Sequence, residues 1–187
     1  MDDEAEAPRW FRLLAKACRR SKKHPIARYA QLATVGADGG PRCRTVVVRG
    51  LSDAPRGVWF VTDGRSAKAT ELAQDPRAEL CWYFAGLREQ YRLRGRVRAW
   101  DDAGRAEAWA RLSPASRATF LWPPPGTPRQ DDDVFPPETR GAHPLECFQA
   151  FTLVPERVDV LSLAPSPHER IEWNSEGGEW AERRMRP

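Results

Sequence analysis

The sequence predicts a mainly β fold: one antiparallel β-barrel with peripheral helices. Five predicted strands follow one another between residues 29 and 100, and a single short helix interrupts them. Such a run favours antiparallel pairing in a barrel over a parallel sheet. The fifth strand alternates polar and apolar residues, as a half-buried strand does. The chain has no G-x-G-x-x-G turn after a strand, which argues against a dinucleotide-binding α/β fold.

The individual elements follow from local patterns. Apolar residues at helical spacing predict an amphipathic helix over 9–22, within an N-terminal segment (1–26) that we expect to pack on the barrel domain (27–187). Strands and one helix then alternate with turn residues. The strands are expected at 29–35, 43–51, 57–62, 78–84 and 89–100, and the helix at 66–74.

The second half of the chain is less regular. Two short helices are expected, followed by a long loop, a hairpin that turns at Pro155, and a short closing pair of strands. Long loops of this kind are often functional. The ranges are 102–112 and 114–121 for the helices, 122–143 for the loop, 148–154 and 157–163 for the hairpin, and 168–173 and 180–183 for the closing pair.

Composition limits the possible functions. The 187 residues carry a net charge of +4, which suits anionic ligands such as phosphate esters without demanding nucleic acid. The four cysteines form no C-x-x-C pair or zinc-like spacing, so we expect no metal and reduced thiols in a cytoplasmic protein, with Cys81 and Cys147 buried. The acidic start does not resemble a signal peptide, and no apolar stretch approaches the length of a membrane span.

The segment R-T-V-V-V-R-G at residues 44–50 places two cations around a β-branched strand. It is either a central strand with its arginines in water, or a cofactor strand whose backbone faces a flat heterocycle while the arginines hold charge. Arg44 and Arg49 have opposite parity, so strict alternation places them on opposite faces. A shared ligand therefore requires a bulge, or a separate role for each arginine at a different end of the ligand.

The segment T-D-G-R-S-A-K at residues 62–68 ends a strand, turns at a glycine and enters a helix at Ser66. A helix start presents free N–H groups and a partial positive charge. Together with the Ser66 hydroxyl and the cations Arg65 and Lys68, this start predicts a phosphate-binding cradle. Ordinary helix capping by Asp63 or Ser66 is the alternative, and capping is compatible with anion binding.

A third segment, E-Q-Y-R-L-R-G at residues 89–95, contains Gln90, whose amide can read the edge of a pyrimidine-like ring. These three segments, with D-P-R-A-E-L-C-W at 75–82 and the tail H-E-R…W…R-M-R-P at 168–187, resemble the pyridoxamine 5′-phosphate oxidase family, and more closely its broad FMN-binding relatives. The resemblance covers residues 27–187.

The resemblance implies an FMN-binding split barrel that forms a homodimer, with two FMN sites between the subunits. By position, Arg49 and His168 are also implied to contact a small-molecule substrate, and Arg65 would replace a family arginine that matches Ala67 here. The residues implied to bind FMN are Arg44, Thr45, Val46, Arg49, Val61, Thr62, Arg65, Ser66, Lys68, Gln90 and, from the partner subunit, Arg170.

The implied activity is that of an FMN-dependent oxidoreductase that transfers hydride from a small organic substrate to FMN, with reoxidation by dioxygen. The family residues that hold the phosphate of the substrate match Trp109, Ser113 and Arg117 here, so two of the three lose their chemistry. We therefore expect a substrate other than pyridoxamine phosphate. The alternatives are a non-catalytic FMN-binding protein and, less favoured, a nucleic-acid-binding barrel suggested by the arginines at 92–98 and the many tryptophans.

Overall fold

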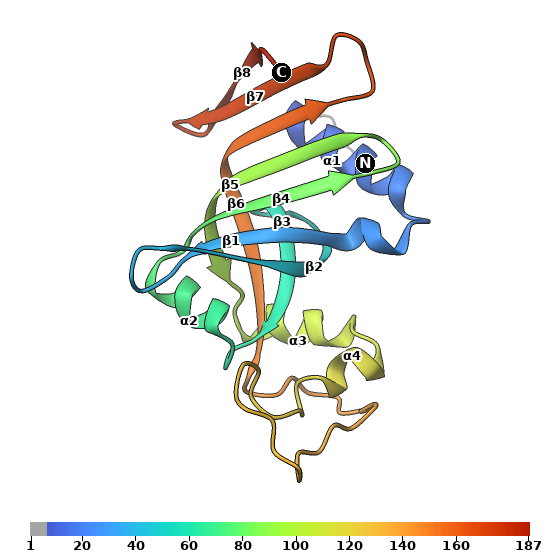
Figure 1. Cartoon of the computed structure of the whole chain (residues 1–187), viewed down its shortest axis with the longest axis vertical. Helices are drawn as coiled ribbons and strands as arrows, with labels where there is room; N and C mark the ends of the chain where they lie inside the picture. Colours follow the sequence, from blue (N-terminus) through green and yellow to red (C-terminus); the bar gives the residue numbers. More distant parts are fainter. Residues whose placement is uncertain (1–6) are drawn as a thin grey trace.

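The computed structural model describes residues 7–187 and centres on a closed barrel of antiparallel strands (Figure 1). The strands pair in the order β3-β2-β1-β4-β5-β6, and a further pairing of β3 with β6 closes the barrel. The predicted antiparallel barrel with peripheral helices is therefore confirmed. The barrel strands are β1 (Tyr29–Val35), β2 (Pro41–Asp53), β3 (Arg56–Asp63), β4 (Arg77–Phe84), β5 (Glu89–Ala99) and β6 (Phe148–Ser162).

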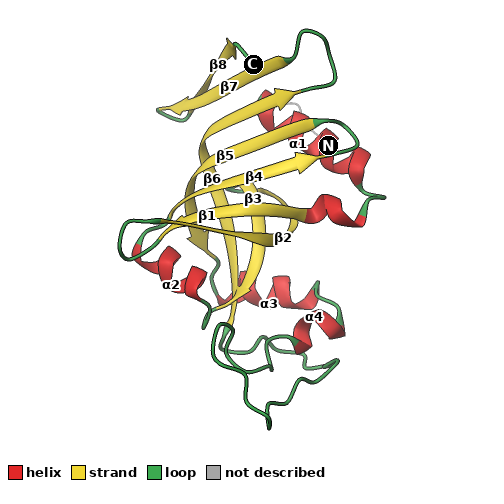
Figure 2. Ribbon diagram, in the orientation of Figure 1, coloured by secondary structure: helices red, strands yellow, loops and turns green. Residues whose placement is uncertain are grey.

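Helices and a C-terminal hairpin surround this barrel (Figure 2). The hairpin extends the sheet, because β7 pairs with β6 and β8 pairs with β7. It lies at one end of the long axis of the molecule, while α3, α4 and the loop after them lie at the other (Figure 1). These elements are α1 (Arg9–Ser21), a 3₁₀ turn η1 (Pro25–Arg28), α2 (Ala67–Gln74), α3 (Asp102–Ala110), α4 (Pro114–Ala118), β7 (Glu169–Glu176) and β8 (Glu179–Met185).

Two apolar clusters fill the interior. The larger one lies inside the barrel, and the apolar stripe of α1, including Trp10 and Leu14, belongs to it. The smaller cluster joins β3 and β6 to the helices that follow β5, through Trp59, Trp109 and Phe148. Burial of each such side chain contributes about 1.5–3 kcal/mol. The smaller cluster thus holds α3 and α4 against one end of the barrel, next to the pocket described below.

The strand β6 corrects one prediction. The expected hairpin over 148–154 and 157–163 is wrong, because the chain continues through Pro155 as one strand of 15 residues. One edge of β6 pairs with β3 over residues 148–153 and with β7 over residues 157–162, while β5 pairs with β6 over residues 151–162. A single strand therefore connects the closure of the barrel to the C-terminal hairpin.

A bulge explains how β6 accommodates a proline. The register between β5 and β6 shifts at Gly95, which faces Pro155. Proline lacks a backbone N–H and is tolerated where the ladder is interrupted. A Cβ atom on Gly95 would lie 2.0 Å from the carbonyl oxygen of Val154, so only glycine fits this close approach. The bulge also bends the strand toward its second set of partners.

The remaining expectations concern cysteines, membranes and metals. All four cysteines are free, and Cys81 and Cys147 are half-buried rather than buried. Within residues 7–187, no helix is long and apolar enough to cross a bilayer. The same residues contain no group of three or more side chains placed to hold a metal ion.

Candidate functional site

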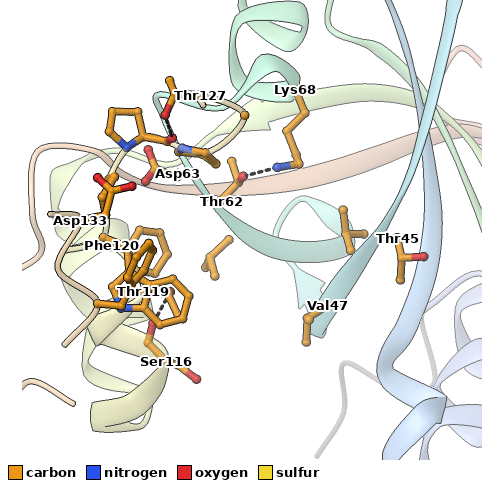
Figure 3. Close-up of a pocket in the computed structure, with 18 of the residues that line it drawn as sticks. Thr45, Val47, Thr62, Asp63, Lys68, Ser116, Thr119, Phe120, Thr127 and Asp133 are labelled. Carbon is orange, nitrogen blue, oxygen red and sulfur yellow. Dashed lines mark hydrogen bonds between the residues drawn. The ribbon is translucent and has the colours of Figure 1, made fainter. Parts of the chain in front are cut away.

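A pocket of about 670 Å³ opens between β2, the end of β3, the start of α2 and the segment that follows α3 (Figure 3). This volume is in the range of cofactor and ligand sites. In Figure 3, Thr45 and Val47 of β2 lie on one side, Phe120 on the opposite side, and Thr62 and Lys68 between them. Six of the residues predicted from the sequence line the pocket: Thr45, Val46, Arg49, Val61, Thr62 and Lys68.

The polar end of the pocket is built where β3 passes into α2. Lys68 Nζ donates a hydrogen bond to Thr62 Oγ1 at 3.0 Å, and Ser66 Oγ lies 3.3 Å from the same oxygen. The Ser66 hydroxyl donates to the carbonyl oxygen of Asp63 at 2.6 Å, and no side chain caps α2. The first amides of α2 therefore stay available to an anion.

The electrostatics of this end favour an anionic ligand. Burial lowers the pKa of Lys68, and the nearby charge of Arg44 lowers it further. A cation with a depressed pKa is stabilised when a negative charge binds beside it. The polar end can thus hold a phosphate between a helix start, the hydroxyl group of Thr62 and the ammonium group of Lys68, while Ser66, which does not line the pocket, lies buried behind Thr62.

Arg49 lies further along β2, at a bulge, which is one of the two arrangements that its parity allowed. The β2–β3 register passes from Val48 to Gly50, so Arg49 is the extra residue. Its Nε atom is buried and has no hydrogen-bond partner within the described residues. Burial, and then the charge of Arg28, lower the pKa of Arg49. A buried donor without a partner costs about 1–3 kcal/mol, so a ligand that offers an acceptor here is favoured.

The opposite wall was not predicted as part of the site. It comes from α4 and the long loop, which contains neither helix nor strand from 119 to 147. The one sequence signal was the length of this loop, together with its W-P-P-P-G segment at 122–126. The wall residues are Ser116, Thr119, Phe120, Trp122, Pro123, Pro124, Pro125, Gly126, Thr127, Arg129, Asp133 and Phe135.

Two predicted arginines make contacts within the protein instead of lining the pocket. Arg44 forms an ion pair with Glu71 of α2 at 2.6 Å and also donates to Thr34. Burial opposes ionisation of Glu71, but the hydrogen bonds from Thr34 and Arg44 outweigh it and lower the pKa of that carboxyl. Arg44 therefore holds α2 against β1 and positions Lys68 indirectly.

Arg65 connects the turn between β3 and α2 to the pocket wall. Its guanidinium pairs with Asp63 at 2.6 Å and donates to the carbonyl oxygens of Phe120 at 3.3 Å and Trp122 at 2.9 Å. The side chain is thus committed to three acceptors of the protein. Arg65 therefore links the end of β3 to Phe120 and Trp122, two aromatic residues of the opposite wall of the pocket.

The other three predicted residues lie away from the pocket, on the side of the C-terminal hairpin. Gln90 pairs with Leu161, and Leu161 pairs with Arg170, so both side chains project from the same face, about 10 Å apart. Arg170 also contacts the buried carboxylate of Asp159 at 2.8 Å. His168, just before β7, has Nδ1 3.0 Å from the carbonyl oxygen of Pro165.

Comparisons with known proteins agree with this arrangement. Residues 7–101 match the family model described as pyridoxamine 5′-phosphate oxidase, FMN-binding domain. The chain is 35% identical to pyridoxine/pyridoxamine 5′-phosphate oxidase 2 of Arabidopsis thaliana, over 82% of this chain and 83% of that protein. The chain belongs to this family.

Solved structures give the same result. A pyridoxamine 5′-phosphate oxidase-related, FMN-binding protein from Nostoc punctiforme PCC 73102 superposes with a TM-score of 0.90 and 36% identity, covering 97% of this chain and 99% of that one. PhzG from Burkholderia lata 383, solved with tetrahydrophenazine-1-carboxylic acid, shares the fold at 18% identity and a TM-score of 0.79, covering 100% of this chain and 97% of that one. The barrel is therefore the split barrel of this family, with FMN as its cofactor.

The residues of this chain fit FMN. A phosphorylated flavin needs an anion site at one end, and Thr62, Lys68 and the start of α2 provide one, with Ser66 in contact with Thr62. It also needs a donor for the polar edge of its ring, and the buried Nε of Arg49 has no other partner in the described chain. Valines 46, 47 and 61 supply apolar surface between the two ends.

The positions that match the substrate-phosphate residues of the family have structural roles here. Trp109 is buried, and its Nε1 donates to the carbonyl oxygen of Gly141 at 2.9 Å. Ser113 accepts a hydrogen bond from the amide of Ser116 and so caps α4. Arg117 donates to the carbonyl oxygens of Trp109 at 3.0 Å and Gly141 at 3.2 Å. None of the three lines the pocket.

The arginines of β5 are interleaved with carboxylates. Arg92 pairs with Glu79 at 2.6 Å, and Arg96 pairs with Glu156 at 3.4 Å. Their alternation with buried residues follows the predicted pattern. A face of mixed charge lacks the continuous positive potential that nucleic-acid binding uses, so this part of the barrel gives no support to that alternative.

Proposed function

We propose that this protein is an FMN-dependent oxidoreductase that holds FMN at the interface of a homodimer and oxidises a small organic substrate other than pyridoxamine phosphate. The observation that carries the proposal is the pocket itself. It combines a phosphate cradle at the β3–α2 junction with the buried, unpartnered Nε of Arg49 on the opposite side of an apolar surface. When bound, FMN supplies the redox chemistry by accepting hydride from the substrate and returning electrons to dioxygen.

The residues of the chain then have distinct roles. Lys68 and Thr62, with Ser66 behind Thr62, bind the phosphate, and Arg49 places positive charge beside the polar edge of the flavin ring. A cation at this edge favours the reduced, negatively charged form of the cofactor. The half-buried setting of Arg49 strengthens that effect, because low dielectric increases electrostatic interactions.

The arrangement of the predicted residues supports a dimer. The phosphate cradle lies at the junction of β3 and α2, whereas Gln90 and Arg170 project together from β5 and β7, on the side of the C-terminal hairpin (Figure 1). Neither Gln90 nor Arg170 lines the pocket of its own chain. A second copy related by two-fold symmetry could place its Gln90 and Arg170 against the cradle of the first, and would produce two equivalent sites.

The proposed substrate differs from pyridoxamine phosphate because its phosphate would lack ligands. Trp109, Ser113 and Arg117 are engaged by the protein, as described above. His168, on the hairpin that a partner would contribute, remains available to position a substrate or accept a proton.

A visible spectrum and a turnover assay test the proposal. We expect the purified protein to be yellow, to quench the fluorescence of added FMN, and to consume oxygen with some members of a panel of amines and alcohols. A colourless protein that leaves FMN fluorescence unchanged would refute the cofactor assignment. FMN binding without turnover would instead identify a non-catalytic flavin-binding protein, and rapid oxidation of pyridoxamine phosphate would refute the substrate assignment.

A mixed dimer tests whether the site is shared. Lys68→Ala and Arg170→Ala each weaken both sites of a homodimer. In a heterodimer of the two variants, one site carries both changes and the other carries neither. We therefore expect co-expression to restore one tightly bound FMN per dimer. Failure to restore FMN binding in a dimer that forms normally would show that each chain binds FMN alone.

A further inference from the structure

We infer that the pocket accepts a planar aromatic carboxylate, which packs against the wall formed by Trp122 and Phe135 and binds Arg129 through its carboxylate. This inference rests on the proposed function, because it assigns Lys68 and Arg49 to FMN and asks what the remaining surface of the same pocket can bind. That surface is formed by residues of the segment 120–135.

The wall is an ordered aromatic surface. The rings of Trp122 and Phe135 meet edge to face, with centroids 5.6 Å apart. Trp122 is fixed by a hydrogen bond from its Nε1 to the carbonyl oxygen of Pro136 at 2.9 Å, and its own carbonyl accepts from Arg65. Phe135 is 40% exposed although it lines the pocket. Apolar area of this kind, held in place and left in water, favours a flat apolar ligand.

Arg129 provides a cation at the edge of this wall. Its guanidinium carbon lies 5.0 Å from the centre of the Phe135 ring, which orients the group by a cation–π contact. No described carboxylate pairs with it. Of the two carboxylates that line the pocket, Asp63 pairs with Arg65, whereas Asp133 forms no ion pair within residues 7–187 and accepts a hydrogen bond from the amide of Gln130 at 2.8 Å, which orients it toward its own loop. Arg129 therefore has no ion-pair partner among the described residues, and its guanidinium donors face the aromatic surface of the pocket.

The geometry favours a carboxylate over a phosphate ester. A guanidinium presents two parallel N–H donors that match the two oxygens of a carboxylate. A phosphate dianion needs further donors, and the positions that hold it in the family are occupied by contacts within α3, α4 and the loop. With Lys68 and Arg49 assigned to FMN, Arg129 is the cation left for a single negative charge.

Ligand titrations on the FMN-loaded protein test this inference. Naphthoate, its neutral isostere naphthamide, and pyridoxal phosphate serve as probes, and the readouts are the visible absorption of the bound flavin and the fluorescence of tryptophan. We expect naphthoate to bind about tenfold more tightly than naphthamide, since a charge-assisted pair is worth that factor. Pyridoxal phosphate should bind more weakly than naphthoate.

Single substitutions show which residues contribute to binding of the two naphthalene probes. Arg129→Gln should weaken naphthoate binding about tenfold and leave naphthamide unchanged, while Phe135→Leu should weaken both probes. Arg140→Gln is the matched control, because Arg140 is an exposed arginine of the same loop that does not line the pocket.

The outcomes separate this inference from the proposed function. Equal affinity for naphthoate and naphthamide, or an Arg129→Gln variant that binds naphthoate normally, would overturn the carboxylate assignment while the protein stays yellow. Tighter binding of pyridoxal phosphate than of naphthoate would overturn it as well. A protein that fails to retain FMN contradicts the proposed function, and the inference falls with it.

Discussion

Removing the guanidinium of Arg65 tests whether this residue holds the pocket wall or binds the phosphate of FMN. The family resemblance implies the second role, whereas the contacts of this chain indicate the first. The two roles predict different losses in the variant Arg65→Ala. If Arg65 links the turn to the wall, its removal loosens the segment at 120–122. If Arg65 binds the phosphate, its removal lowers the affinity for FMN.

The size of the effect follows from the contacts of Arg65. Its side chain is 35% exposed, so the ion pair with Asp63 contributes less than about 1 kcal/mol. The hydrogen bonds to the carbonyl oxygens of Phe120 and Trp122 are charge-assisted, and at this exposure each contributes roughly 1 kcal/mol. Their loss should weaken attachment of the wall by about 2 kcal/mol, which is about 30-fold in the ratio of attached to detached states.

Hydrogen exchange measured by mass spectrometry is the assay. In Arg65→Ala we expect amides near 120–136 to exchange roughly 30-fold faster, while the affinity for FMN changes less than about threefold. Arg65→Lys is the matched control, because it keeps the charge but cannot reach both carbonyls and Asp63 together. If Arg65→Ala lowers the affinity for FMN tenfold or more and the amides near 120–136 exchange at the wild-type rate, the wall-linking role is refuted and the phosphate-binding role is supported.

Three further predictions concern the cradle, the bulge and the acid stability of the barrel. Lys68→Ala should weaken FMN binding about 10- to 100-fold through the loss of a charge-assisted contact, as measured by flavin fluorescence, and unchanged affinity would remove Lys68 from the cradle. Gly95→Ala should lower the free energy of unfolding by about 1–3 kcal/mol in urea, because the new Cβ meets the backbone of Val154; a smaller loss would mean that the bulge relaxes freely. A hydrogen bond from Asn174 chiefly holds the pKa of Glu172 below its usual value, so its stabilisation is present above about pH 4.5 and is lost as the pH falls through the lowered pKa. Glu172→Gln should therefore make unfolding in urea less dependent on pH between about pH 5 and pH 3, and an unchanged slope would contradict this.

The strands were predictable because their signals are local. Alternation in β5 and the β-branched centre of β2 specify strands without knowledge of their partners. The hairpin predicted at Pro155 was wrong for the opposite reason. A proline is acceptable inside a strand only if the neighbouring strand offers an interruption, and that interruption lies at Gly95, sixty residues earlier in the chain.

The candidate site also has one part that is local in the sequence and one part that depends on distant contacts. The cradle could be predicted because a strand end, a turn and a helix start are consecutive in the sequence. The aromatic wall could not, since Trp122 and Phe135 reach the pocket through contacts with distant residues such as Arg65. Likewise, only the folded chain shows that Glu71 engages Arg44 and that the bulge at Arg49 turns its Nε into a buried position.

Closure of the barrel leaves β8 as the outer strand of the sheet in the described chain, with one side of its backbone unpaired. Such an edge can recruit a strand from another molecule and start aggregation. The sequence of β8, E-W-A-E-R-R-M, is mostly exposed and carries four charged side chains in seven residues. Those charges make stacking of identical edges unfavourable, so truncation or neutralisation of this strand should first show itself as reduced solubility at high protein concentration.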